Sequence, residues 1–146
     1  MEVVHKKSFS VVGFKIETNW TELVEALPRA WDKIFKRASE IKYKIDNQFL
    51  SISLKKDGDI YTELICVEVS EIASIPEGMV GLTIPEHTYA YCPHHGSIKN
   101  INDTFRELYR WTNQNGYITD YIKIDYGYKQ KDKDPVDHSL FVKLDI

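Results

Sequence analysis

The sequence predicts an α+β fold: two similar strand-helix-strand-strand units form one pseudo-twofold antiparallel sheet, with helices on one side and a cleft at the seam. Three observations predict it. The order of elements repeats, and the helical segments carry apolar stripes. The strand segments alternate apolar and polar residues and are bounded by turn residues. With 146 residues, 42% hydrophobic and 28% charged, the chain has the composition of one compact domain. We expect a single domain over residues 1–146, with repeat units of about 1–75 and 76–146 that bury their sheets by pairing.

The first unit begins with a strand and a helix. Phe9–Ile16 is rich in β-branched and aromatic residues, which is typical of a strand. Asn19 is a plausible N-cap, and Pro28 interrupts the pattern that follows, so we expect a short turn from Trp20 and a main helix beginning near Pro28. The apolar stripe of this helix consists of Trp31, Ile34, Phe35 and Ala38.

Two further strands complete the first unit. Leu50, Ile52 and Leu54 alternate with serines, and the charged turn that follows leads into a second strand, Ile60–Val69. Pro76–Met79 marks the joint between the two units. This arrangement predicts a hairpin whose two strands lie side by side in the sheet.

The second unit repeats the same order. Strands are expected at Thr88–Cys92, Tyr121–Tyr128 and Leu140–Ile146, with a helix at about Ile98–Asn115 capped by Ser97. The charged segment 129–137 is interpreted as a solvated hairpin end. The repetition places the second helix on the same side of the sheet as the first.

Composition excludes several kinds of partner. The net charge is -3 and only four residues are Arg, so we expect no direct binding to nucleic acid. No apolar stretch is long enough for a membrane span or a signal peptide, and the two cysteines form no ligand pattern, which favours an unanchored protein in the cytoplasm. Neighbouring His94 and His95 point apart on an extended chain and have no third ligand nearby, so we expect neither a metal nor a cofactor.

Aromatic residues are the unusual part of the composition. The chain has 9 Tyr, 6 Phe and 3 Trp, and buried tyrosines need partners for their hydroxyl groups. Ligand pockets favour seams between structural units and are lined mainly by apolar and aromatic side chains. The seam is therefore the place where we expect the functional site.

Several short motifs then point to a family. They are Tyr89-Ala90-Tyr91-Cys92-Pro93-His94-His95-Gly96, a helix with Phe105, Tyr109 and Trp111, Gly116-Tyr117, Pro76-Glu77-Gly78-Met79 with Ile84-Pro85, and Gly13 with Trp31 and Phe35. In their order and spacing, over nearly the whole chain, they resemble the GyrI-like family. This family includes the effector-binding domains of AraC-type and MerR-type regulators and the DNA gyrase inhibitor protein.

The resemblance implies a duplicated strand-helix-strand-strand fold and an aromatic cleft that binds hydrophobic or cationic small molecules. The family usually carries a Glu-x-Tyr pair on the strand after the second helix. In this sequence Asp125 falls on the Glu position and Gly127 on the Tyr position, with Tyr126 and Tyr128 on either side of the glycine. Strand alternation places both tyrosines on the face opposite Asp125 unless Gly127 permits a bulge.

Glu68 is an alternative acid. It shares a strand face with Leu64 and Cys66, where a carboxylate is costly unless it is paired or faces a wet cleft. The other interpretation is an exposed position near the end of the strand. The expected aromatic walls of the site are Tyr89, Tyr91 and Trp111, with Tyr126 as a further ligand-binding residue, whereas Trp31 is assigned to the core.

The expected function is that of a stand-alone effector-binding protein, without its own helix-turn-helix, that senses or sequesters a hydrophobic or cationic ligand and reaches transcription through a protein partner. One alternative is a hydrolase of strained electrophiles, in which Asp125 or Glu68 is the base and Tyr126 or Tyr91 the hydrogen-bond donor. The other is a protein-binding inhibitor of the gyrase type, for which the net charge of -3 is mild.

Overall fold

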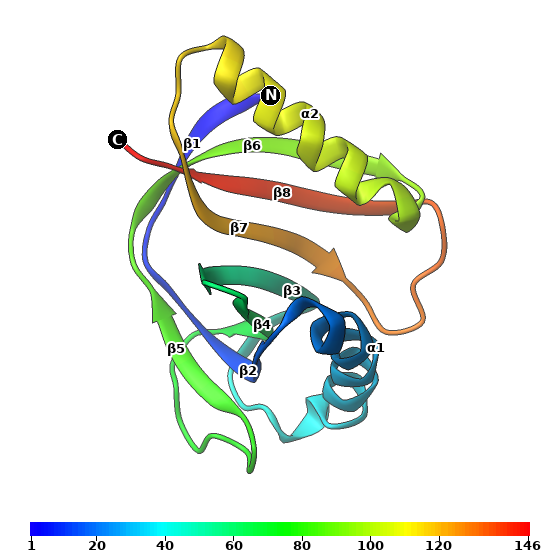
Figure 1. The fold of residues 1–146 in the computed structure, drawn as a ribbon. Helices are drawn as coiled ribbons and strands as arrows, with labels where there is room; N and C mark the ends of the chain where they lie inside the picture. The colour runs from blue at the N-terminus through cyan, green and yellow to red at the C-terminus, as the bar shows by residue number, and fades with distance from the viewer.

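A computed structural model describes residues 1–146 and shows eight antiparallel strands in one sheet with two α-helices (Figure 1). The predicted α+β fold class is confirmed. The order of strands across the sheet is β1-β6-β8-β7-β3-β4-β2-β5. The strands are β1 (Glu2–Lys6), β2 (Phe9–Thr18), β3 (Lys44–Asp57), β4 (Ile60–Val69), β5 (Val80–Ile84), β6 (His87–Gly96), β7 (Thr119–Tyr128) and β8 (Val136–Leu144).

The sheet is symmetric about its central pair, β3 and β7. On one side of this pair lie β4 and β2, and on the other lie β8 and β6, so the two strand-helix-strand-strand units meet at the β3–β7 seam. Ser51 of β3 stands opposite Asp125 of β7. The seam therefore brings together the middle strands of both units.

The two outer strands are exchanged between the units. β1 pairs with β6 of the second unit, and β5 pairs with β2 of the first. Only Lys7 and Ser8 separate β1 from β2, and only Pro85 and Glu86 separate β5 from β6. The sequence patterns did not predict these two short strands.

Helix α1 (Trp20–Lys36) is one continuous helix that passes through Pro28. The prediction of a short turn followed by a helix beginning near Pro28 is therefore wrong. Asn19 caps the helix, since its side chain accepts a hydrogen bond of 2.9 Å from the backbone N–H of Glu22. Proline removes one backbone donor, and the buried contacts of residues such as Leu23 and Ile34 hold the helix together across this gap.

Helix α2 (Ile101–Gln114) follows a single 3-10 turn, Ile98–Asn100, which Ser97 caps through the backbone N–H of Lys99. Strand β6 continues to Gly96, beyond the predicted end at Cys92, and so includes His94 and His95. Neither helix is long and apolar enough to cross a membrane.

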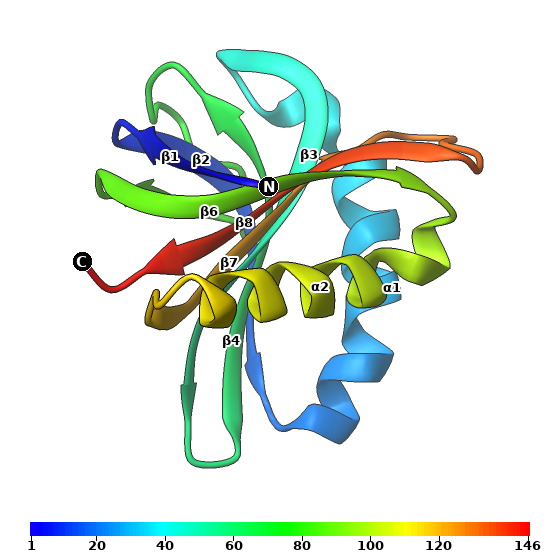
Figure 2. The same cartoon turned by 90° about the horizontal axis from the view of Figure 1, so that it is seen from above.

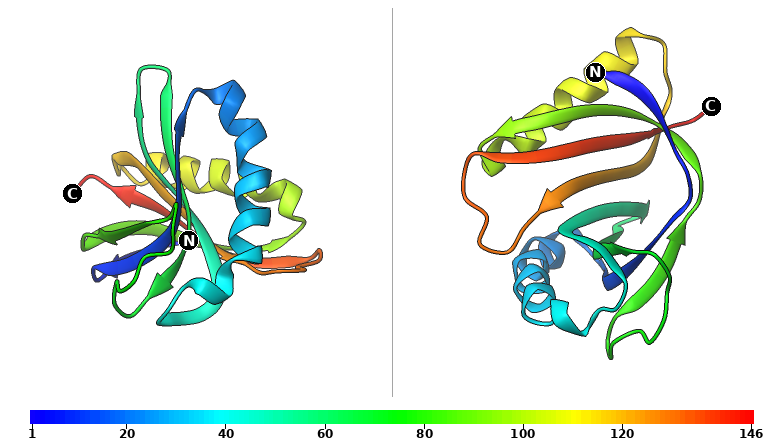
Figure 3. Two further views of the ribbon diagram at one scale, coloured as in Figure 1. Left: turned by 90° about the horizontal axis from the view of Figure 1, so that it is seen from below. Right: turned by 180° about the vertical axis from the view of Figure 1, so that it is seen from behind.

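Both helices lie on the same side of the sheet, with their axes running in different directions (Figures 2 and 3). One apolar cluster packs beneath α1 around Ile34 and Ile65, and a second beneath α2 around Leu108 and Leu140. A third cluster, which includes Tyr89, covers the opposite face of the sheet. Each fully buried apolar side chain contributes about 1.5–3 kcal/mol to folding, so both faces of the sheet stabilise the fold.

Candidate ligand-binding cleft

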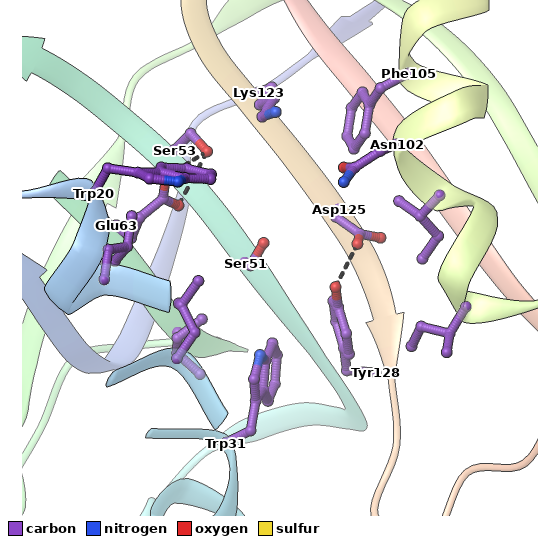
Figure 4. Close-up of a pocket in the computed structure, with 15 residues that line it drawn as sticks. Trp20, Trp31, Ser51, Ser53, Glu63, Asn102, Phe105, Lys123, Asp125 and Tyr128 are labelled. Atoms are coloured by element: carbon purple, nitrogen blue, oxygen red, sulfur yellow. Dashed lines mark hydrogen bonds between the residues drawn. The ribbon is translucent and has the colours of Figure 1, made fainter. Parts of the chain in front are cut away.

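A cleft of about 320 Å³ opens between α1 and α2, above the β3–β7 seam (Figure 4). Its floor comes from β3, β4 and β7, and its walls come from the two helices. The lining residues are Trp20, Leu23, Leu27, Trp31, Ser51, Ser53, Glu63, Ile65, Ile98, Ile101, Asn102, Phe105, Lys123, Asp125 and Tyr128. The cleft lies at the seam, where the sequence predicted the functional site.

Small side chains on β3 leave room for the cleft. Ser51 and Ser53 point toward the helices, whereas Leu50 and Ile52 between them point into the core on the opposite face. The alternation of a β-strand produces this division. A larger pair of residues at the two serine positions would fill part of the space between the helices.

Asp125 is the most deeply held acid of the cleft, with 5% of its surface exposed. Tyr128 donates a hydrogen bond of 2.6 Å from its hydroxyl to Oδ2 of Asp125. The Nδ1–H of His138, whose side chain is fully buried, donates a second bond of 2.6 Å to Oδ1. Two donors thus hold the carboxylate in one orientation at the floor of the cleft.

A bulge at Gly127 brings Tyr128 to the same face as Asp125. In the pairing of β3 with β7, Leu50 stands opposite Tyr126 and Phe49 stands opposite Tyr128, so Gly127 is an extra residue in β7. Its φ of 133° favours glycine. The extra residue reverses the alternation, and the carboxylate and tyrosine come together as Asp-x-x-Tyr.

Glu63 supplies a second carboxylate. It accepts hydrogen bonds of 2.9 and 3.0 Å from the hydroxyl of Ser53, its neighbour across the β3–β4 pair. Burial raises the pKa of Glu63, while the Ser53 hydrogen bond and the charge of Lys123 oppose this rise. The cleft therefore holds two carboxylates and one ammonium group.

Aromatic rings form much of the remaining wall. Trp31 and Tyr128 stack with ring centroids 4.1 Å apart. The ammonium group of Lys123 lies 4.8 Å from the ring centre of Phe105, and Trp20 is 60% exposed at the rim. Trp31 packs against the core beneath α1, as expected, but it also lines the cleft.

The predicted walls lie elsewhere. Trp111 stacks on Tyr117 at 5.9 Å in the apolar cluster beneath α2. Tyr89 is completely buried in the cluster on the opposite face of the sheet, and Tyr91 packs there against Phe141 with centroids 5.2 Å apart. None of these three residues lines the cleft between the helices.

Glu68 and Tyr126 lie together in a separate pocket on the opposite face of the sheet. The hydroxyl of Tyr126 donates a hydrogen bond to Asp46. Strand alternation separates Tyr126 from its neighbour Asp125. Of the six residues predicted to bind ligand, the structure therefore places Asp125 alone in the cleft.

Sequence reasoning missed Glu63, Trp20 and the cleft-lining position of Trp31. One signal was available: Ser51 and Ser53 put two small polar residues on the helix-facing side of a strand whose other face is apolar. Small residues there indicate space above the sheet. Glu63 stands opposite Ser53 in the hairpin and faces the same space.

Residues 1–139 match the family described as GyrI-like small molecule binding domain. The transcriptional regulator BrlR of Pseudomonas aeruginosa is 26% identical over an alignment of 146 positions that covers 99% of this chain and 53% of BrlR. The chain thus spans about half the length of this curated relative.

Two solved structures share the fold. SAV2435, solved bound to tetraphenylphosphonium, superposes with a TM-score of 0.75 at 13% identity over 99% of this chain and 93% of its own. A hydrolase from Listeria innocua superposes with a TM-score of 0.55 at 8% identity, over 99% and 90% of the two chains.

Proposed function

Since the chain belongs to the family of GyrI-like small molecule binding domains, we propose that it binds a hydrophobic cation in the cleft between α1 and α2. In this proposal the protein senses or sequesters its ligand. Asp125 and Glu63 face the positive charge, and the aromatic walls receive the apolar body of the ligand. The ligand bound by SAV2435, which shares the fold, belongs to this chemical class.

The charge balance of the cleft is the observation that carries the proposal. Asp125 and Glu63 bring two carboxylates to a space with one ammonium group, that of Lys123. Charges 4 Å apart interact by about 4 kcal/mol near a protein surface. Each aromatic face adds about 0.5–2 kcal/mol toward a cation, so Trp31 and Tyr128 favour a charged ligand with a flat apolar surface.

A link to transcription is the second part of the proposal. BrlR is a transcriptional regulator of which this chain covers about half. We expect the domain to act in the cytoplasm through a protein partner, with no direct contact to nucleic acid, because the net charge of -3 does not favour a phosphate backbone. A pull-down with and without ligand would identify such a partner.

Titration calorimetry with tetraphenylphosphonium tests the binding site. Asp125→Asn and Glu63→Gln each remove one negative charge and are expected to weaken binding about tenfold. Glu68→Gln is the matched control, because it removes a carboxylate on the opposite face of the sheet. Equal affinity of all three variants and of the wild type would contradict the site.

An uncharged analogue tests the class of ligand. Triphenylphosphine oxide offers similar aromatic surface without a net charge, so it is expected to bind at least about tenfold more weakly than the phosphonium ion. If the two compounds bind equally well, the cleft selects apolar surface and the carboxylates do not contribute.

Hydrolysis is the second candidate, and one feature favours it: a partly buried carboxyl group with a raised pKa, Glu63, faces the same cleft as the Tyr128–Asp125 pair. Such groups activate water and stabilise a leaving oxygen. Mass spectrometry after incubation with an aryl epoxide distinguishes the two functions. Addition of water that depends on Glu63 or Asp125 would show catalysis, and unchanged epoxide would leave binding alone.

A further inference from the structure

A second pocket, of about 280 Å³, lies on the face of the sheet away from the helices. Strands alone form it, and it adjoins the short crossing between β1 and β2, where Lys6 and Phe9 enter its lining. Leu50 and Ile124 are buried and line it as well. The complete lining is Lys6, Phe9, Leu50, Glu68, Ile124, Tyr126, Ser139 and Phe141.

This pocket contains one charge of each sign, and the two do not pair with each other. Glu68 is half-buried and has neither a hydrogen bond nor an ion pair. Burial raises its pKa, the charge of Lys6 partly opposes this rise, and the charge of Asp46 adds to it. The ammonium group of Lys6 lies 4.6 Å from the ring centre of Phe141 and 5.4 Å from that of Phe9, with no carboxylate within ion-pair distance. An unpaired carboxylate in a partly apolar pocket is costly, so a ligand that pairs with it recovers energy.

The sheet itself separates this pocket from the cleft between the helices. Leu50 and Ile124 line the second pocket, while their strand neighbours Ser51 and Asp125 line the cleft. A substitution at Glu68 therefore leaves the lining of the cleft unchanged. The two pockets also differ in charge, since the cleft has two carboxylates for one ammonium group and this pocket has one of each.

We infer that this pocket is a second small-molecule site, and that its ligand is a small apolar zwitterion carrying one ammonium and one carboxylate group. Glu68 pairs with the ammonium group, Lys6 with the carboxylate, and the rings of Phe9 and Phe141 cover the apolar part. Charge-assisted hydrogen bonds of this kind are about twice as strong as neutral ones. Hydrophobic amino acids are the simplest molecules of this class.

Three related probes test the inference: L-phenylalanine, 2-phenylethylamine, which lacks the carboxylate, and 3-phenylpropanoate, which lacks the ammonium group. In amide chemical-shift titrations we expect L-phenylalanine to bind at least about tenfold more tightly than either single-charge probe. The shifts are expected at Leu50, Ile124 and Ser139. Equal affinity for all three probes, or no saturable shift with any of them, would overturn the inference.

Substitutions assign the two charges. Glu68→Gln is expected to reduce the affinity for L-phenylalanine to that for 3-phenylpropanoate, and Lys6→Met to that for 2-phenylethylamine. Asp125→Asn is the matched control and should leave the L-phenylalanine titration unchanged. Loss of binding in Asp125→Asn, or shifts confined to α1 and α2, would place the amino acid in the cleft and overturn the inference. Binding of tetraphenylphosphonium to the cleft is measured in a separate titration. A negative result for one site therefore does not affect the test of the other.

Discussion

Gly127 decides which tyrosine meets Asp125. Its φ of 133° belongs to a backbone region that residues other than glycine rarely adopt. A Cβ at this position would lie 2.7 Å from the carbonyl oxygen of Asp137 and 3.1 Å from the Cα of His138. One glycine thus positions the Tyr128–Asp125 hydrogen bond at the floor of the cleft.

We predict that Gly127→Ala destabilises the protein by about 3 kcal/mol, because a strained backbone and a backbone clash add together. Affinity for tetraphenylphosphonium should fall as Tyr128 leaves Asp125. Gly58→Ala is the control: its φ is also positive, at 58°, but nothing lies within 4 Å of the added Cβ, so the expected cost is about 1 kcal/mol. Urea denaturation measures both, and equal losses would show that the close contact at Gly127 is unimportant.

Glu63 makes the stability of the protein and its affinity for a cation depend on pH. Its pKa in the folded protein is raised above the ordinary 4.5 by burial, so the folded state holds this proton more tightly than the unfolded state. This contribution to stability is complete below pH 4.5 and is lost as the pH rises through the raised pKa. A bound cation favours the ionised form, so its affinity rises over the same range.

We predict that Glu63→Gln removes this contribution from the pH dependence. Above the pKa of Glu63 the variant should be at least as stable as the wild type without ligand, and its affinity for tetraphenylphosphonium should change less with pH. Denaturation and calorimetry over a pH series measure the two effects. An unchanged pH profile of affinity in the variant would show that another group controls binding.

At the scale of elements, helix α1 forms one wall of the cleft and contains a proline in its interior. Leu27 and Trp31 line the cleft on either side of Pro28, which is itself exposed. The backbone carbonyl of Val24, which a residue other than proline would engage at position 28, lacks this intrahelical donor. The part of α1 that carries Trp31 is therefore held in place more by side-chain packing than by backbone hydrogen bonds within the helix.

We predict that Pro28→Ala stabilises the protein by about 1–3 kcal/mol, because alanine restores the donor and the helix propensity. Asn19→Ala tests the same helix in the opposite direction and should cost about 1 kcal/mol through loss of the N-cap. Thermal and urea denaturation measure both. A loss of stability in Pro28→Ala would show that the geometry around the proline is needed by the packing of α1.

Local patterns predicted that two helices and the long strands are present, although not that α1 begins at Trp20. These elements bury one face each, and the burial leaves a period in the sequence. The five-residue strands β1 and β5 escaped prediction because their pairing with β6 and β2 determines them more than their own residues do. Periodicity also assigned Trp31 to the inner face of its helix without indicating whether the space there is filled. Asp125 was found through the family resemblance, because it falls on the Glu position of the Glu-x-Tyr pair, and no motif indicated Glu63.

At the scale of the whole molecule, the exchanged outer strands join the two units. β1 covers the edge of β6, and β5 covers the edge of β2, so each unit borrows an outer strand from the other half of the sequence. An uncovered sheet edge offers unpaired backbone groups and invites aggregation. Dividing the chain at the boundary between the sequence repeats therefore does not give two halves that each contain all the strands of their own part of the sheet.

We predict that residues 1–75 and 76–146 do not fold when expressed alone, since each fragment lacks the strand that covers its sheet edge and the partner across the β3–β7 seam. Co-expression of both fragments should restore the native fold and the affinity for tetraphenylphosphonium. Amide spectra of the separate and combined fragments measure this. A well-dispersed spectrum from either fragment alone would show that this fragment folds without the outer strand from the other half.

The exchange also sets an order of events during synthesis on the ribosome. The chain emerges from its N-terminus, so β1 leaves the ribosome first although its partner β6 follows more than eighty residues later, as the pairing of Glu2 with Tyr91 shows. The edge of β2 likewise waits for Val80–Ile84. Pairings this distant along the chain form slowly. The nascent first half therefore depends on its surroundings, including chaperones, until the strands of the second half arrive to cover it.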